Sequence, residues 1–214
     1  MGLWLQVQFG TLSDLALKKY LSYLWGVKAL MIKTGILGNS IKGQLVELVP
    51  VSLDWLQDFH EYSVQAELYE HLEFNAFRTM EDSREYLNKL IFRSSSAGTQ
   101  YWFIKLPDNE KVVGTIGLHS FDQSRNSVEV GYGVSPEYWG QGIFKATLGM
   151  IINFAFNEIA VHRIVARTSA NNTASICGLE KLGFIREGEM RDYYRDTDGH
   201  RFNALLYSKL STDI

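Results

Sequence analysis

The segment from Ser127 to Phe156 constrains the fold of this chain more than any other segment. It begins with the alternating pattern SVEVGYGV, continues with the turn WGQG and ends in the apolar run IFKATLGMIINFAF. The alternation predicts a strand, and the apolar run predicts a helix. Gly140 and Gly142 let the turn approach a ligand closely where the helix leaves its first N–H groups unpaired. The pattern therefore indicates a phosphate-binding turn, unless it only connects a strand to a helix.

The segments on either side predict an α+β domain. Short alternating or β-branched runs predict strands, and capping signals followed by apolar periodicity predict helices. In chain order we expect a strand at 44–51, helices at 52–65 and 79–92, strands at 100–106, 112–121 and 127–134, a helix at 143–159, a strand at 162–169, a helix at 171–182, and strands at 184–194 and 201–209. This order predicts a mixed, mostly antiparallel sheet that is covered by helices on both faces.

The first part of the chain has a composition of its own. Residues 1–42 contain five lysines and one acid, whereas the whole chain has a net charge of −3. The pattern TLSD at Thr11 resembles a capping box and predicts a helix to about Lys33. Its apolar run, Tyr20–Ile32, is too short to span a bilayer, so we expect no stable membrane insertion. The helix is expected to pack on the body or on a second subunit, as in a homodimer, with peripheral membrane contact as an alternative.

The boundary of the main domain is expected near residue 43. Gly35–Gly43 is a plausible linker, which divides the chain into an N-terminal helical extension and linker at 1–42 and a principal domain at 43–214. A start of the chain at Met31 is a further alternative, and it would remove most of the extension.

The composition argues against several classes of function. A sequence pI near 6.0 gives no general basis for nucleic-acid binding, which usually needs a basic face. The single cysteine, Cys177, excludes an internal disulfide framework and suits a reducing compartment, so we expect a cytoplasmic protein and a packed, inert thiol. The histidines show no metal-ligand spacing, so no metal is expected; they lie at positions 60, 71, 119, 162 and 200.

Three motifs in the predicted order carry a family resemblance. They are EVGYGV from Glu129, YWGQGIF from Tyr138, and NTAS from Asn172 followed by LEKLGF. The chain resembles the GNAT superfamily of acetyl-CoA-dependent N-acetyltransferases, and within it the Rim-type branch of ribosomal-protein alanine N-acetyltransferases. The resemblance covers residues 43–210. It implies a GNAT fold with a splayed sheet, acetyl-CoA as cosubstrate and no metal.

The resemblance also implies where the cofactor binds. The glycine-rich element would present backbone N–H groups to the pyrophosphate, and Asn172 would bond the pantetheine arm. A bulge near Gly133 and Val134 would splay the sheet and expose groups that polarise the thioester carbonyl. Trp139 and Phe144 depart from the commonest residues at their positions, and Phe144 is expected to alter how closely the helix sits. The implied cofactor-binding set is Gly133, Val134, Trp139, Gly140, Gln141, Gly142, Ile143, Phe144 and Asn172.

Three residues are catalytic candidates. Glu129 is the preferred base, since its counterpart in many relatives faces the acceptor, and an exposed strand carboxylate is the alternative. His119 is the second candidate base, because its unperturbed pKa lies near neutrality. Ser175 matches a serine suspected in this branch of protonating the departing thiolate, although a serine in a first helical turn often bonds locally. Leu179 stands where many members have the tyrosine that serves as the acid.

The expected function is direct transfer of an acetyl group from acetyl-CoA to a primary amine. The branch favours a protein or peptide N-terminus as acceptor, and an amino sugar or another small amine is the alternative. The segment Glu67–Phe77, which mixes aromatic and acidic residues, is expected to be packing or to wall a substrate pocket. A rival of another class is a non-catalytic acyl-CoA-binding or assembly module whose working surface is the N-terminal helix.

Overall fold

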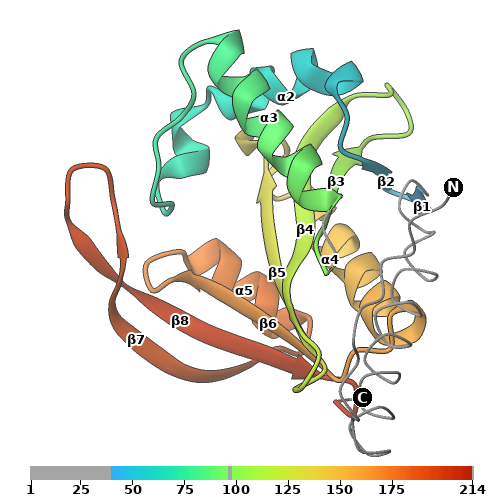
Figure 1. Ribbon diagram of the computed structural model, residues 1–214, viewed down its shortest axis with the longest axis vertical. Helices are drawn as coiled ribbons and strands as arrows, with labels where there is room; N and C mark the ends of the chain where they lie inside the picture. The colour runs from blue at the N-terminus through green and yellow to red at the C-terminus, as the bar shows by residue number, and fades with distance from the viewer. Residues whose placement is uncertain (1–39, 96–97, 214) are drawn as a thin grey trace, which may run out of the picture.

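The described part of the fold comprises residues 40–95 and 98–213 of a computed structural model (Figure 1). The predicted helix at 11–33 and most of the predicted linker lie outside these residues. A single eight-stranded sheet carries the order β1-β2-β3-β4-β5-β6-β8-β7. The strands are β1 (Ile41–Lys42), β2 (Glu47–Pro50), β3 (Gln100–Lys105), β4 (Val112–Asp122), β5 (Ser127–Val134), β6 (Arg163–Ser169), β7 (Ile185–Arg195) and β8 (Arg201–Leu210).

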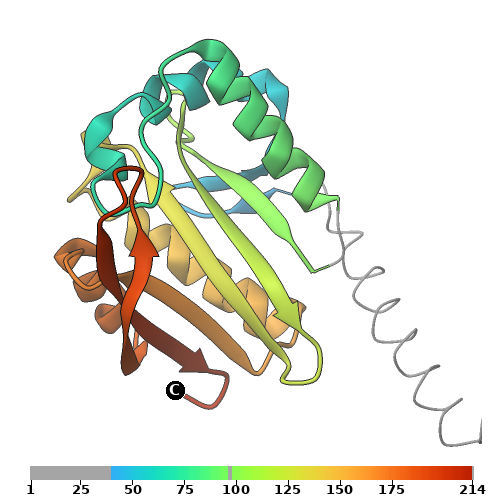
Figure 2. The same ribbon diagram turned by 60° about the vertical axis from the view of Figure 1, so that its left-hand side comes forward.

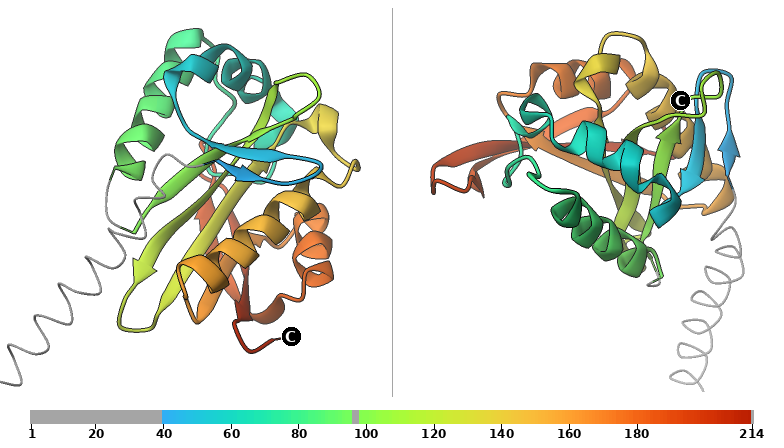
Figure 3. Two further views of the ribbon diagram at one scale, coloured as in Figure 1. Left: turned by 90° about the vertical axis from the view of Figure 1, so that its right-hand side faces the viewer. Right: turned by 90° about the horizontal axis from the view of Figure 1, so that it is seen from above.

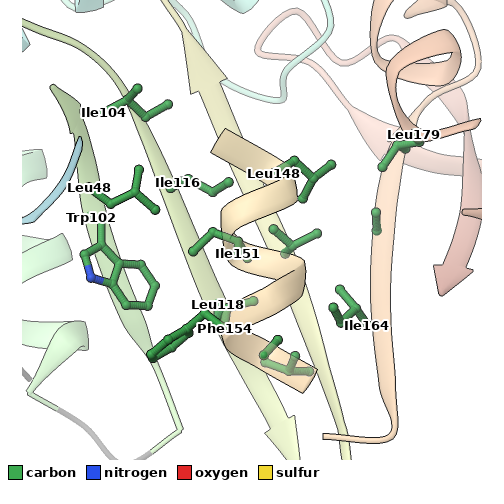
Figure 4. Packing of buried hydrophobic residues seen from close by; sticks show 14 of the residues in the cluster. Leu48, Trp102, Ile104, Ile116, Leu118, Leu148, Ile151, Phe154, Ile164 and Leu179 are labelled. Carbon is green, nitrogen blue, oxygen red and sulfur yellow. The ribbon is translucent and has the colours of Figure 1, made fainter. Parts of the chain in front are cut away.

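Helices cover both faces of the sheet, as the sequence predicted (Figure 3). On one face α2 (Leu56–Ser63) and α3 (Met80–Ser94) pack on a cluster that includes Phe103 of β3. On the other face lie α4 (Ile143–Asn153) and α5 (Thr173–Lys181). Leu148 and Ile151 of α4, with Leu179 of α5, enter the larger core cluster there (Figure 4). Burial of this apolar surface is the main stabilising contribution.

Most element boundaries agree with the sequence patterns, and the capping box at Thr79 is formed. The Thr79 hydroxyl accepts from the N–H of Asp82, whose carboxylate accepts from the N–H of Thr79. Two details differ. The end of the predicted linker forms the short strand β1, because Ile41 pairs with Leu48. The predicted helix at 143–159 ends in a π-helical turn, Phe154–Glu158.

The sheet divides between β5 and β6. These parallel strands pair only from Ser127 with Arg163 to Val130 with Ala166. Beyond that point β5 stays on β4, whereas β6 continues along β8, so the two strands separate toward their carboxyl ends (Figure 1). The splayed sheet expected from the sequence is therefore present. The expected bulge near Gly133 and Val134 is absent from the β4–β5 pairing, whose register is regular there.

Candidate functional site

The turn before α4 presents unpaired backbone N–H groups at the mouth of the split. Gly140 and Gly142 have φ values of 75° and 80°, a left-handed conformation that favours glycine. Ile143 begins the helix, and the N–H of Ala146 makes the first helical bond, to the carbonyl of Gly142. Within the described residues no acceptor contacts the backbone N–H groups from 140 to 145. This is the geometry that binds phosphate at a helix N-terminus.

Two lysines lie beside this turn, in an open groove along α4 with a volume of about 670 Å³. Lys145 in the first turn of α4 lines the groove with Gly142. Lys42 lines it too, which was not predicted because Lys42 stands in the expected linker. The wall is otherwise largely apolar and includes Ala146, Met150 and Leu182. Positive charge for an anion is thus available in the groove beside the turn.

The open edge of β5 carries backbone groups of Tyr132 and Val134. The N–H of Ser135 bonds β4 at Val113, and successive residues of a strand point their backbone groups to opposite sides. Val134 and Tyr132 therefore face away from β4, toward the split, while Gly133 faces β4. The indole of Trp139 donates to the Val134 carbonyl at 2.7 Å. Tyr132, which the sequence did not single out, thus belongs to the edge of the split.

Phe144 occupies the space between α4, β5 and α5. Its ring centroid is 4.6 Å from that of Tyr132. A Cβ atom on Gly178 of α5 would lie only 2.3 Å from Cε1 of Phe144. Because Gly178 has no side chain, α5 leaves room for the ring of Phe144, which stands where a small residue is usual.

Asn172 and Ser175 begin helix α5 on the far side of the split. The Asn172 side chain accepts from the N–H of Ser175 at 3.0 Å, so Asn172 is the N-cap of α5. The Ser175 hydroxyl is buried and lies 2.5 Å from the Tyr132 hydroxyl. The Ser175 hydroxyl therefore bonds Tyr132 across the split instead of a nearby backbone group, which a serine in a first helical turn often bonds.

Glu129 is half-buried and ion-paired. Both of its carboxylate oxygens accept from Arg167 of β6, with Nε to Oε1 at 2.8 Å and Nη2 bonded to Oε2. Arg167 also donates to the Tyr193 hydroxyl and lies over its ring. Val128 and Val130 enter the core under α4, so Glu129 lies on the opposite face, as its alternation predicted.

His119 is the cross-strand neighbour of Glu129 on the same face. Its Nδ1 lies 3.0 Å from the Ser120 hydroxyl, and its ring stacks on Tyr101. Burial lowers the pKa of His119, a shift that Arg167 and Arg93 reinforce and Glu129 opposes. His119 is therefore neutral at pH 7 and able to accept a proton.

The segment after α2 lies over this face of the sheet, near the split. Leu68 is 3.5 Å from the position of a Cβ on Gly133, and Glu73 accepts from the N–H of Arg195 at the end of β7. Figure 2 shows the β7–β8 hairpin reaching this segment. Tyr69 and Phe74 also pack on the aromatic cluster around Phe77. The segment Glu67–Phe77 therefore packs on the aromatic cluster with one side and forms a wall near Glu129 with the other.

Leu179 lies in the core, and the neighbouring Glu180 accepts from the hydroxyl of the buried Tyr207. Cys177 is exposed rather than packed as expected. Within residues 40–95 and 98–213 no group of three His, Cys, Asp or Glu side chains is arranged to hold a metal ion. No helix of the same ranges has the length and apolarity needed to cross a bilayer.

Comparison with known proteins gives this geometry a family. Residues 46–185 match the family model described as an acetyltransferase (GNAT) domain. The chain is 25% identical over 153 residues to "Uncharacterized N-acetyltransferase p20" of Bacillus licheniformis, which covers 72% of this chain and 85% of the relative. It is 35% identical over 100 residues to "Putative ribosomal N-acetyltransferase YdaF" of Bacillus subtilis, which covers 47% of this chain and 54% of the relative.

The fold has solved counterparts as well. The self-immunity acetyltransferase MccE of microcin C7, solved in complex with acetyl-CoA and AMP, superposes with a TM-score of 0.71. The superposition covers 78% of this chain and 93% of that chain at 19% sequence identity, so it supports the arrangement of the elements and not the choice of acceptor.

Proposed function

Because the chain belongs to the GNAT acetyltransferase family, we propose that it transfers an acetyl group from acetyl-CoA directly to a primary amine. The observation that carries this proposal is the split between β5 and β6, with the unpaired N–H groups of the α4 turn at its mouth. A thioester arm fits the open edge of β5, where the Val134 carbonyl accepts from Trp139 and the backbone groups of Tyr132 face the split, and a pyrophosphate fits the turn. The acetyl-CoA complex of a structural neighbour supports the same choice of cosubstrate.

In this proposal the cofactor residues divide into three groups. The backbone from Gly140 to Lys145 holds the pyrophosphate, with Lys42 and Lys145 nearby. The open edge at Tyr132 and Val134 pairs with the pantetheine arm and polarises the thioester carbonyl, which stabilises the negative charge that develops on its oxygen. The amide of Asn172 remains available to the arm from the other side, since only its oxygen is used as a cap.

The amine must be neutral when it attacks. Deprotonation at pH 7 costs roughly 4–5 kcal/mol for a lysine-like amine and about 1 kcal/mol for an α-amine. An α-amine therefore needs little assistance. We assign the proton acceptor to the pair Glu129 and His119, with proton transfer through water. Arg167 occupies both oxygens of Glu129, which favours His119 as the group that takes the proton and Glu129 as its electrostatic partner.

The acceptor we favour is a protein or peptide N-terminus, and a small amine such as an amino sugar is the second candidate. Both reach the sheet on the face of His119 and Glu129, where the segment around Leu68 and Glu73 forms a wall. The α-amine is favoured because a site with a neutral histidine and a paired carboxylate suits a weakly basic amine. The name of the relative YdaF supports the same class.

The proposal is tested with the purified full-length chain, acetyl-CoA and a panel of amines. The panel contains peptides with free N-termini, the same peptides with blocked N-termini, amino sugars and polyamines, and the readouts are thiol release and product mass. We expect acetylation of free N-termini and a loss of at least 10²-fold in kcat for His119→Asn, a typical effect of removing a general base. Glu129→Gln should also lose activity.

A matched control distinguishes this loss from misfolding. His162→Asn changes an exposed histidine that contacts Ser211 and precedes the end of β6 that is paired with β5, away from the split, and should leave activity unchanged. If acetyl-CoA binds but no amine in the panel is acetylated, the enzyme proposal is wrong and the binding-module alternative gains. If only amino sugars or polyamines react, the transferase assignment holds and the peptide acceptor is wrong.

A further inference from the structure

The side chain of Tyr132 links strand β5 to helix α5 across the split. Tyr132 lies on β5 beyond the last residue pair with β6, and its hydroxyl is 2.5 Å from that of Ser175 at the start of α5. Its ring packs on Phe144, which fills the space left by Gly178. The ring is therefore held in place, and its hydroxyl has Ser175 as its partner among the described residues.

The protonation of Tyr132 and its available partners favour one direction for this hydrogen bond. Burial raises the pKa of the Tyr132 hydroxyl, so it remains protonated at neutral pH. Tyr132 is half-buried, and the Ser175 oxygen is the acceptor within reach of its proton among the described residues, so we assign Tyr132 as the donor. Ser175 then accepts this bond, and its own proton is left to donate elsewhere. The Asn172 cap fixes the backbone of Ser175 at the same time.

We propose that Tyr132 is a positioning residue that turns the Ser175 hydroxyl toward the sulfur of the bound thioester. This inference rests on the proposed function. In the reaction a bond forms between the amine nitrogen and the acetyl carbon, the carbon–sulfur bond breaks, and the electron pair stays on sulfur. Ser175 donates a hydrogen bond to that sulfur as charge develops. The nitrogen loses one proton to the base and the sulfur finally gains one, so the reaction is balanced without another reactant.

A purely structural role would give a different pattern of effects. A bond that only joined β5 to α5 would lower stability when removed, and it would change KM for acetyl-CoA if the split changed its width. A bond that directs the Ser175 hydroxyl at a developing charge acts mainly in the transition state, so its loss lowers kcat and leaves KM nearly unchanged. The two roles are separable by steady-state kinetics.

The experiment is a double-mutant cycle in the full-length chain with Tyr132→Phe, Ser175→Ala and the combination. Tyr132→Phe keeps the ring against Phe144 and removes only the hydroxyl. We expect each single variant to lower kcat about 10- to 100-fold with KM for acetyl-CoA within about twofold, and the double variant to be no worse than Ser175→Ala, because residues that act as one unit are not additive.

Tyr207→Phe is the matched control. It removes another buried tyrosine hydroxyl that bonds α5, at Glu180, and should leave kcat unchanged. The inference is overturned if Tyr132→Phe retains wild-type kcat, if it changes KM alone, or if its effect multiplies with that of Ser175→Ala. Wild-type chain in the same assay separates the two proposals: a wild type that acetylates no amine refutes the proposed function, whereas an active wild type with an unaffected Tyr132→Phe refutes only this inference.

Discussion

At the scale of single residues, Arg167 changes how the two candidate bases are understood. A free carboxylate beside the acceptor is a natural base, but Glu129 is bonded through both oxygens. The negative charge of Glu129 raises the pKa of the neighbouring His119, whereas the positive charges of Arg167 and Arg93 lower it. The His119 ring also stacks on Tyr101. The arginine therefore adjusts the protonation of the histidine through the carboxylate between them.

Replacing Arg167 should shift the pH dependence of the reaction. In Arg167→Gln the charge of Glu129 is no longer balanced, so the pKa of His119 rises from its lowered value. Because the neutral imidazole is the active form, the acidic limb of the kcat/KM profile should move to higher pH, with the greatest loss of activity below pH 7. The measurement is kcat/KM from pH 5 to 9.

The control for this prediction is Arg163→Gln in the same strand. Arg163 pairs with Glu187 and does not contact His119 or Glu129. Its profile should coincide with that of the wild type. An unchanged acidic limb in Arg167→Gln would show that His119 does not set this limb.

Residue patterns predicted some of this site and missed the rest. Alternation placed Glu129 on the face opposite Val128 and Val130, and the glycine pair predicted the turn, which the structure shows to be left-handed at both glycines. The partners of these residues were not visible, because Arg167 lies 38 positions beyond Glu129 and Ser175 lies 43 beyond Tyr132. Tyr132 shares its face with Val128 and Val130, and that alternation was the one signal that could have placed it beside the helices.

At the scale of the elements, the packing of α4 against α5 depends on a large residue, Phe144, that faces a glycine, Gly178. The departure at Phe144 predicted a change in how closely the helix sits, and the structure shows what adapts to it. Gly178 of α5 receives the ring, and Tyr132 closes the other side. The geometry of the cofactor turn is therefore coupled to the helix that carries Ser175.

Gly178→Ala should destabilise the protein. The added methyl would meet the Phe144 ring at 2.3 Å and force it against Tyr132. Overpacking of this kind costs about 1–3 kcal/mol, and each kcal/mol lowers Tm by about 2–4 °C for a chain of this size. Thermal unfolding measures the loss.

A second helical glycine provides the comparison. A Cβ on Gly149 of α4 meets no described atom within 4 Å, so Gly149→Ala should raise stability by about 0.5–1 kcal/mol. Equal losses of Tm in both variants would contradict the packing argument and indicate a general cost of alanine in these helices.

At the scale of the whole molecule, the order of the elements was predictable and the split was only partly so. Capping signals and periodicity located most of the helices and strands between residues 44 and 210, because each depends on local sequence. The division of the sheet depends on where β6 stops pairing with β5 while it remains paired with β8. The local sequence of neither strand predicts this point. The family resemblance predicted the splayed sheet correctly, but it attributed the splay to a bulge near Gly133 and Val134 that is absent from the β4–β5 pairing.

Amide hydrogen exchange should show directly whether acetyl-CoA binds in the split. The amides of Tyr132 and Val134 face the open edge, whereas that of Gly133 faces β4. Acetyl-CoA should slow exchange at Tyr132 and Val134 and leave Gly133 nearly unchanged, as measured by amide-resolved NMR. Uniform protection of all three would mean general stabilisation by the ligand rather than pairing along the edge.

The division of the sheet also bears on the order in which the two substrates meet. The α4 turn and α5 lie on one face and His119 with Glu129 on the other, so in the proposed reaction the thioester and the amine would approach from different faces and meet at the gap. Neither has to leave before the other enters. Initial-rate plots should therefore give intersecting lines rather than the parallel lines of a ping-pong mechanism, and free CoA should compete with acetyl-CoA but not with the amine.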